Sequence, residues 1–210
     1  MQEVLLKYFP KLNPTQLEQF KNLEKVFPEW NNKINCISRK DIDNLFIHHI
    51  LHSLSIALKF EFDETHTIAD IGTGGGFPGL PLAIMFPKAK FDLVDSIAKK
   101  ITVVSAMKNE LNLQNVNAIN SRAEILKPKY DFVISRAVTA FPNFYNLVKN
   151  IILSKTKHNK QGIIYLKGGN FDEELKEFKN FKIFNIYELM NYQHFETKKM
   201  IYLPVNKKTL

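Results

Sequence analysis

The chain has 210 residues, a formal net charge of +8 and one cysteine, Cys36. This length supports one large α/β domain with its own core, but not two full domains. A single cysteine excludes an internal disulfide and a cysteine-built metal site, which fits a reducing compartment. No apolar run is long enough to span a membrane and no leader pattern stands at the N-terminus, so we expect a cytoplasmic protein.

The positive charge is unevenly distributed. Acidic and basic residues nearly balance in residues 1–66, so the basic excess belongs to residues 67–210. Within that part, residues 132–171 contain no acidic residue. The surplus suggests an acidic partner such as nucleic acid, while a solvated charged face is an equally good interpretation of the block.

Residues 1–66 show helical periodicity. Asn13 followed by Pro14 is a typical helix start, and apolar residues then recur at helical spacing. A second helix is predicted over residues 41–60. We expect a helical extension packed on residues 67–210, which form one globular unit.

Residues 67–79 are predicted to be a strand that runs into a glycine-rich turn. The apolar segment 68–71 suits a buried parallel strand, and glycines follow it directly. Glycine adopts positive φ and lets a ligand approach the backbone, and the helix predicted over residues 80–86 adds free N–H groups. Such a unit is the usual nucleotide-binding corner of an open α/β sheet.

After this corner, predicted strands and helices alternate. Further strands are expected over residues 90–95, 116–120, 131–135, 162–167, 182–188 and 198–205. Ser96 is expected to cap a helix whose apolar face begins at Ile97. Seven strands with alternating helices indicate a doubly wound, Rossmann-like α/β fold with a mostly parallel sheet. The last two strands, with no helix between them, are expected to pair antiparallel at one edge.

The glycine corner discriminates between cofactors. A dinucleotide-binding loop needs its third glycine where this chain has Phe77, and the Gly-Lys-Ser/Thr ending of a P-loop is missing. Asp70 ahead of Gly-x-Gly-x-Gly is the pattern of methyltransferases that use S-adenosylmethionine. Asp95, which ends the second strand, can accept hydrogen bonds from the ribose hydroxyls of either cofactor type. Its alternative role is to cap the next helix.

Missing residues narrow the reaction. Methylation of an exocyclic amine usually relies on an Asn/Asp-Pro-Pro-aromatic loop after the fourth strand, where this chain has Ser135 and Arg136. Attack through a pyrimidine carbon needs a cysteine nucleophile, and Cys36 lies far upstream in the helical extension. A ring nitrogen such as guanine N7 already carries a lone pair, so its methylation needs positioning and no general base.

Several short motifs occur in a characteristic order. They are residues 70–79, 93–96, 121–124, 134–137 and 166–168, preceded by Trp30-Asn31, Asn35 and His49-Ile-Leu-His-Ser53. Their order and spacing resemble the bacterial 16S ribosomal RNA guanine-N7 methyltransferases, also called the glucose-inhibited division protein B family. The resemblance covers nearly the whole chain and implies methylation of N7 of one guanosine in 16S ribosomal RNA. We expect the enzyme to be a class I methyltransferase and a monomer.

The expected cofactor-binding residues are Gly72, Gly74, Gly76, Phe77, Asp95, Ala123, Glu124 and Arg136. The resemblance puts Gly72 and Phe77 at the methionine end of S-adenosylmethionine. It puts Asp95 at the ribose and the 123–124 pair around the adenine. Arg136 would lie beside the cofactor and face the RNA.

Two positions depart from the family pattern. Gly75 stands where alanine or proline is common, and His52 stands where an aspartate is usual. The second departure puts any polar role of position 52 in doubt, and the first is expected to loosen the loop.

The basic residues divide by topology. Active sites of open α/β sheets lie at the carboxyl ends of strands, where Arg136 and Lys167 end the fourth and fifth strands. We expect these two to position the guanine or to bind RNA phosphate. Lys155, Lys157 and Lys160 precede the fifth strand and are expected at the opposite end of the sheet.

Other interpretations stay open at this point. A dinucleotide oxidoreductase is one, although Phe77 argues against it; a ribosome-assembly RNA-binding protein with weak or no activity is another. His48 and His52 have metal-ligand spacing but lack a third ligand, so no metal site is expected. Trp30 and Asn31 could pack and cap the helical extension instead of contacting RNA.

Overall fold

A computed structural model describes residues 1–136, 138–153 and 161–205. The strands are β1 Thr67–Ile71, β2 Lys90–Asp95, β3 Val116–Asn120, β4 Phe132–Arg136, β5 Gly162–Gly168, β6 Lys182–Asn185 and β7 Lys198–Pro204. The α-helices are α1 Gln2–Tyr8, α2 Pro14–Lys33, α3 His52–Leu54, α4 Gly79–Met85, α5 Ala98–Glu110, α6 Phe141–Val148, α7 Asp172–Leu175 and α8 Ile186–Met190. Short 3₁₀ turns are η1 Ile42–Asn44, η3 Ser55–Leu58, η4 Ala123–Ile125, η5 Lys149–Ile151 and η6 Gln193–Phe195, and η2 Leu45–Leu51 is a π-helix.

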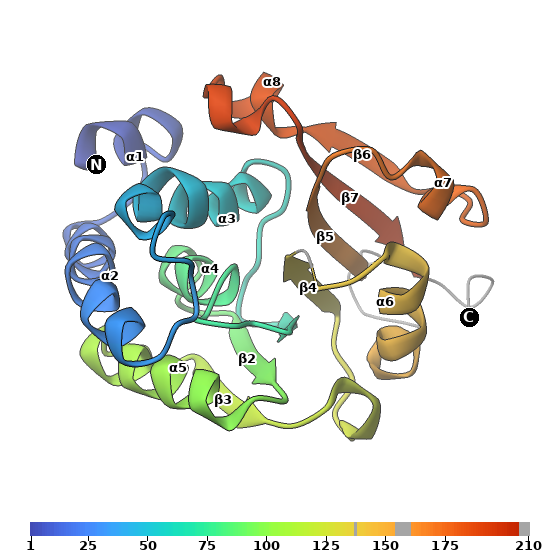
Figure 1. Ribbon diagram of the computed structural model, residues 1–210, viewed down its shortest axis with the longest axis horizontal. Helices are drawn as coiled ribbons and strands as arrows, with labels where there is room; N and C mark the ends of the chain where they lie inside the picture. Colours follow the sequence, from blue (N-terminus) through green and yellow to red (C-terminus); the bar gives the residue numbers. More distant parts are fainter. Residues whose placement is uncertain (137, 154–160, 206–210) are drawn as a thin grey trace.

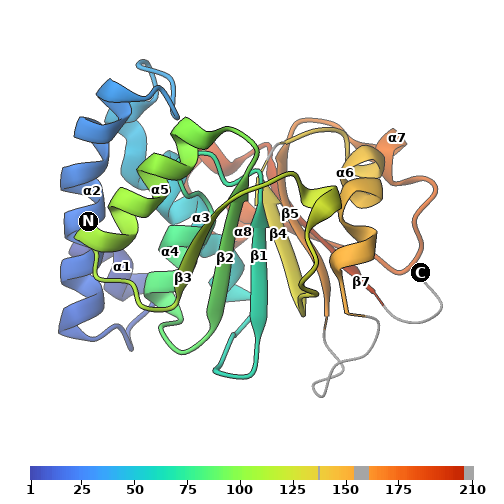
Figure 2. The same cartoon turned by 90° about the horizontal axis from the view of Figure 1, so that it is seen from below.

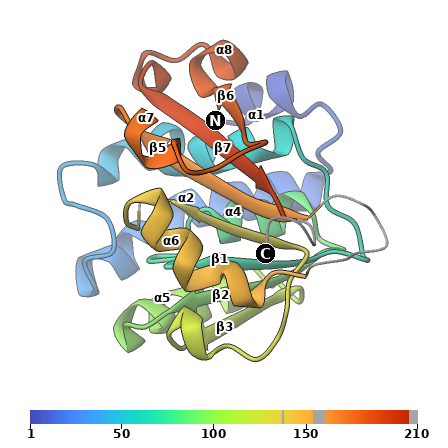
Figure 3. The same ribbon diagram turned by 90° about the vertical axis from the view of Figure 1, so that its right-hand side faces the viewer.

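All these strands form one sheet in the order β3-β2-β1-β4-β5-β7-β6. The strands β1 to β5 pair in parallel, and β7 is antiparallel to both β5 and β6. Figure 3 shows this order, from β3 at one edge to β7 and β6 at the other. The predicted Rossmann-like sheet is confirmed.

Two apolar clusters cover the two faces of the sheet, because successive strand side chains point to opposite sides. Ile68 of β1 belongs to the same cluster as Phe20 of α2 and Leu5 of α1, whereas Ala69 belongs to the same cluster as Phe144 of α6. Figures 1 and 2 show α2, α4 and α5 on one face and α6 on the other. The N-terminal helices therefore share a core with the sheet.

Helix α2 begins where the sequence predicts. Asn13 Oδ1 accepts from Gln16 N at 3.0 Å, and Gln16 Oε1 accepts from Asn13 N at 3.0 Å, a reciprocal capping box. Gln16 Nε2 also donates to Ile84 O and Met85 O, carbonyls at the end of α4. This single side chain thus starts one helix and ties it to the helix that follows the glycine loop.

The helix predicted over residues 41–60 is present but irregular. It passes through 3₁₀, π and α geometry between Ile42 and Leu58. Ser53 Oγ donates to His49 O at 2.6 Å and Ser55 Oγ donates to His52 O at 2.6 Å, and such bonds back to the backbone bend helices. The π turn leaves His49 buried, where it faces the sheet.

Two predictions about element ends were wrong. Ser96 does not cap α5; Asp95 Oδ1 accepts from Ile97 N at 2.9 Å, and Ile97 is 49% exposed instead of lying on the apolar face. The strand predicted over residues 182–188 ends at Asn185, whose side chain caps the short helix α8. The last two strands pair antiparallel as predicted, but a helix does lie between them.

Within the described ranges, no helix combines the length and apolar character that crossing a membrane requires.

Candidate active site

A cavity of about 570 Å³ opens at the carboxyl ends of β1, β2 and β4. The predicted residues that line it are Gly72, Gly74, Phe77, Asp95, Ala123, Glu124 and Arg136. The strand order reverses direction between β1 and β4, which is where open α/β sheets bind ligands. The volume falls in the range of small-molecule sites.

The loop glycines differ in what they face. A Cβ at Gly74, where φ is 60°, would meet nothing within 4 Å, so the backbone there is open to the cavity. A Cβ at Gly76, where φ is 100°, would lie 2.3 Å from Leu80 Cδ1. Gly76 is not among the lining residues, and its glycine allows the loop to pack closely on α4.

Asp70 stabilises the glycine loop through two hydrogen bonds. Its Oδ2 accepts from Thr73 Oγ1 at 2.6 Å and from Gly79 N at 2.8 Å. Burial raises the pKa of this carboxyl to about 7, although both hydrogen bonds oppose the rise. The acidic residue that identified the motif in the sequence therefore shapes the loop and does not line the cavity.

The Asp95 carboxylate bonds both the glycine loop and the residue that precedes α5. Its Oδ1 accepts from Ile97 N at 2.9 Å, just before α5, and its Oδ2 accepts from Gly74 N at 3.0 Å. Each carboxylate oxygen can accept a second hydrogen bond, and Asp95 lines the cavity. The capping alternative is wrong, because α5 has Ile97 as its N-cap residue and no side-chain cap; Asp95 keeps acceptor capacity toward the cavity.

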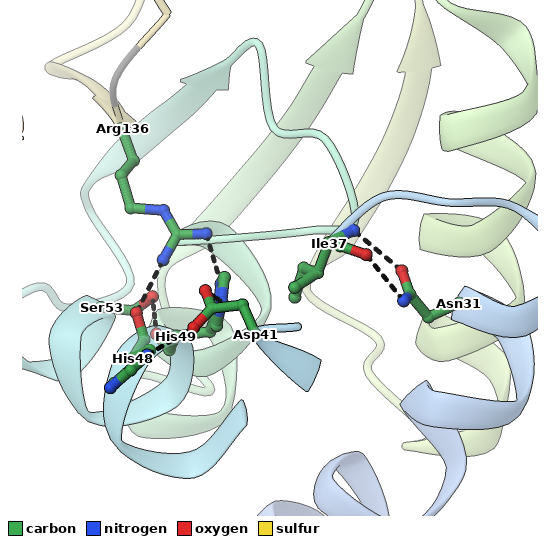
Figure 4. Close-up of polar contacts among 7 residues, drawn as sticks. All are labelled: Asn31, Ile37, Asp41, His48, His49, Ser53 and Arg136. Atoms are coloured by element: carbon green, nitrogen blue, oxygen red, sulfur yellow. Dashed lines mark hydrogen bonds and ion pairs between the residues drawn. The ribbon is translucent and has the colours of Figure 1, made fainter. Parts of the chain in front are cut away.

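Arg136 is fixed by the π turn of the N-terminal extension (Figure 4). Its Nη1 donates to His48 O at 3.1 Å and its Nη2 to His49 Nδ1 at 2.7 Å. Its guanidinium lies over the Phe77 ring, 5.7 Å from the centroid. Burial lowers the pKa of Arg136 to about 10, so it stays protonated at neutral pH.

The contacts that hold Arg136 were not predicted from the sequence. Asp41 Oδ1 contacts His48 Nδ1 at 2.5 Å, and Asp41 Oδ2 contacts His49 Nε2 at 2.7 Å. Of the histidine pair considered for a metal, His48 stacks on His194 with 3.5 Å between ring centroids, and His52 packs on Phe195 at 5.6 Å. No group of three or more metal-ligating side chains occurs among the residues described by the structure. In the sequence, the motif over residues 49–53 was the signal that pointed to the cluster of Asp41, His48 and His49.

Lys167 points away from the cavity. Arg136 is level with Leu166 in the sheet, so Lys167 projects to the opposite face, toward α6 and α7. Its Nζ lies 2.6 Å from Glu174 Oε1 and 2.5 Å from Oε2. Lys155, Lys157 and Lys160, and the last residue of the 134–137 motif, lie outside the described residues.

Cys36 belongs to the N-terminal extension, as expected, but lies at the cavity wall. Asn31 brings it there: Asn31 Oδ1 accepts from Cys36 N at 2.9 Å and Ile37 N at 2.8 Å, and its Nδ2 donates to Ile37 O at 2.9 Å (Figure 4). Asn31 thus holds the loop after α2 and does not cap the helix itself, whose C-cap residue is Ile34. Trp30 is half-buried under Lys33. Burial raises the pKa of the Cys36 thiol, so it is a poor nucleophile at neutral pH.

Two solved structures share this fold. The T. thermophilus 16S rRNA N2 G1207 methyltransferase, solved with AdoMet and guanosine, has a TM-score of 0.55 at 16% identity over 75% of this chain and 42% of its own. A SAM-dependent methyltransferase from Aquifex aeolicus has a TM-score of 0.53 at 17% identity over 79% and 97%. The sheet and its cavity define a class I methyltransferase whose cofactor is S-adenosylmethionine. The open backbone at Gly74 and the spare acceptors of Asp95 fit this group.

The particular family follows from the sequence. Residues 16–202 match GidB, described as rRNA small subunit methyltransferase G. Proteins named Ribosomal RNA small subunit methyltransferase G are 50% identical in Flavobacterium johnsoniae and 44% identical in Porphyromonas gingivalis. Each match covers 97% of this chain, with 98% and 93% of the relatives. The chain belongs to this family, which confirms the resemblance drawn from its motifs.

Proposed function

We propose that the protein transfers the methyl group of S-adenosylmethionine to N7 of one guanosine in 16S ribosomal RNA of the small subunit. The names of the relatives support a ribosomal RNA substrate. The observation that carries the choice of N7 is the end of β4. It presents a guanidinium to the cavity, while Ser135 Oγ donates to Ile71 O at 2.7 Å and is buried.

A guanidinium donates hydrogen bonds but does not accept a proton, so Arg136 cannot act as a general base at neutral pH. It can bind the guanine O6 or a phosphate and thereby orient the base. N7 methylation needs only such positioning, because N7 attacks through its lone pair and loses no proton. The bound donor supplies an electrophilic methyl group. The chain's own contribution is to hold the two reactants in line.

The proposal assigns residues to the two reactants. Gly72, Gly74, Gly76, Phe77, Asp95, Ala123, Glu124 and Arg136 form the cofactor side; for Gly76 the contribution is the loop shape. Arg136 also faces the RNA. Lys167 is assigned to an RNA phosphate, for which it would exchange its present partner Glu174. We infer in addition a monomer that acts in the cytoplasm, with residues 1–66 as an extension of the 67–210 catalytic domain.

Methyl transfer from labelled S-adenosylmethionine to 30S subunits and to naked 16S RNA tests the proposal. We expect a single 7-methylguanosine, mapped by chemical strand scission and mass spectrometry. Calorimetric binding of NAD but not of S-adenosylmethionine would favour an oxidoreductase. Binding of the donor without transfer to either RNA would favour an assembly protein. Light scattering on the purified protein measures whether it is a monomer.

A further inference from the structure

The contacts around His49 fix its tautomer. A carboxylate only accepts and a guanidinium only donates. His49 Nε2 must therefore carry the proton that it donates to Asp41 Oδ2 at 2.7 Å, while Nδ1 is unprotonated and accepts from Arg136 Nη2 at 2.7 Å. Only one arrangement of protons allows both hydrogen bonds of the Asp41–His49–Arg136 network to form.

The ionisation states of the three residues in this network agree with that proton arrangement. Burial and the nearby Arg136 charge lower the pKa of His49 to about 4, despite the contact with Asp41. Burial raises the pKa of Asp41, but the hydrogen bonds from His48 and His49 outweigh it, so its net shift is downward. At neutral pH the three groups are therefore a carboxylate, a neutral imidazole and a guanidinium. The unprotonated Nδ1 of a neutral histidine can accept the hydrogen bond from Arg136, whereas an imidazolium has no acceptor nitrogen.

Asp41 also fixes the second contact of Arg136. Asp41 Oδ1 lies 2.5 Å from His48 Nδ1. The backbone carbonyl of His48 accepts from Arg136 Nη1 at 3.1 Å. The His49 ring packs edge-on against Phe77 at 5.6 Å, so Phe77 supports both the imidazole and the guanidinium. Figure 4 shows Asp41 beside His48 and His49, which in turn contact Arg136.

Resting on the proposed function, we propose that Asp41 and His49 are positioning residues that aim the Arg136 guanidinium at the guanine substrate. Arg136 uses one N–H of Nη1 and one of Nη2 for these contacts, which leaves further donors of the fork for the substrate. The N-terminal extension thus completes the substrate side of a site whose cofactor side belongs to the sheet.

Single substitutions test the effect on methyl transfer. Asp41→Asn removes the charge, and His49→Asn keeps an acceptor for Arg136 but loses Asp41. We expect Asp41→Asn and His49→Ala to lower kcat/KM for RNA roughly tenfold or more, with His49→Asn retaining more activity than His49→Ala. The Kd for S-adenosylmethionine should rise by a smaller factor than kcat/KM falls, because Arg136 also borders the cofactor cavity but the contacts of Asp95 and Gly74 are untouched.

A second aspartate–histidine pair supplies the matched control. Asp63 Oδ1 lies 2.8 Å from His66 Nδ1 just before β1, at the amino end of the strands. Asp63→Asn should leave kcat/KM for RNA unchanged. An equal loss in Asp63→Asn and Asp41→Asn, or a parallel loss of donor affinity in Asp41→Asn, would overturn the positioning role.

A double-mutant cycle tests whether Asp41 acts through Arg136. In an Arg136→Lys background, Asp41→Asn should cost less than about twofold in kcat/KM, because the fork that it orients is gone. Full additivity of the two losses overturns the proposal.

A spectroscopic readout separates this inference from the proposed function. Histidine-ring ¹H–¹⁵N spectra at pH 7 should show His49 as the Nε2–H tautomer, and Arg136→Ala should perturb its Nδ1 shift while leaving His66 unchanged. An Nδ1–H or imidazolium form of His49 refutes the network even if the wild type methylates RNA. If the wild type transfers no methyl group to RNA but shows this tautomer, the proposed function fails and the network stands.

Discussion

Asp95 Oδ2 accepts a hydrogen bond from the Gly74 N–H at 3.0 Å, so one carboxylate links the end of β2 to the turn after β1. Because the same carboxylate lines the cavity and each of its oxygens can accept a second hydrogen bond, we expect it to hold the ribose. Asp95→Ala should weaken binding of S-adenosylmethionine roughly 100-fold, the loss of two charge-assisted hydrogen bonds. Calorimetry measures this, with Glu110→Gln at the exposed end of α5 as control. A change in Kd of less than threefold would contradict the assignment of Asp95 to the ribose.

Gly75 lies against α2. A Cβ there would stand 2.7 Å from Phe27 Cζ, which supplies a reason for glycine where the family pattern has a larger residue. Gly75→Ala should lower the free energy of unfolding by about 1–3 kcal/mol through overpacking. Phe27→Leu removes the clashing atom, so adding Gly75→Ala to it should cost clearly less. Urea unfolding of the four proteins measures the coupling, and additive costs would contradict the steric account.

The Lys167–Glu174 ion pair decides whether Lys167 reaches RNA. If Lys167 binds a phosphate, Lys167→Ala should weaken RNA binding and reduce the salt slope of log K by about 1. Glu174→Gln should then strengthen RNA binding, because Lys167 is released from its partner at 2.5 Å. Fluorescence titrations at several salt concentrations measure both. An unchanged slope in Lys167→Ala would leave Lys167 with a structural role only.

Asp70 should make stability depend on pH in an unusual direction. Burial raises its folded-state pKa to about 7, above the ordinary value of 3.8, so between these values the folded protein holds more protons than the unfolded chain. Its contribution to stability is therefore complete below about pH 4 and is lost as the pH rises to about 7, by roughly 1.4 kcal/mol per pH unit at most.

Comparison with Asp70→Asn isolates this effect from that of the histidines. The free energy of unfolding of the wild type, minus that of the variant, should fall steadily between pH 5 and pH 7. Urea unfolding across this range measures the difference. A constant difference would mean that Asp70 stays ionised in the folded protein.

Local sequence patterns determined most of the fold and the identity of the cofactor corner. Strand and helix periodicities placed all seven strands, because these patterns depend on neighbouring residues in the chain. Gly74 and Asp95 were recognised because the loop and the strand end that present them are local features. The short helix α8 was missed since its five residues carry too little periodicity to separate it from a strand end.

Only the tertiary structure decided what surrounds the reacting groups. Cys36 lines the cavity from the N-terminal extension, and Asp41 and His49 of the same extension hold Arg136 at the cavity wall. The hydrogen bond from Arg136 to His49 joins residues 87 positions apart. No local pattern encodes such a contact, because it depends on how α2 and the π turn pack against the sheet. The same holds for Lys167: its sequence position placed it correctly at the end of β5, but the register with β4 turned its side chain to the opposite face.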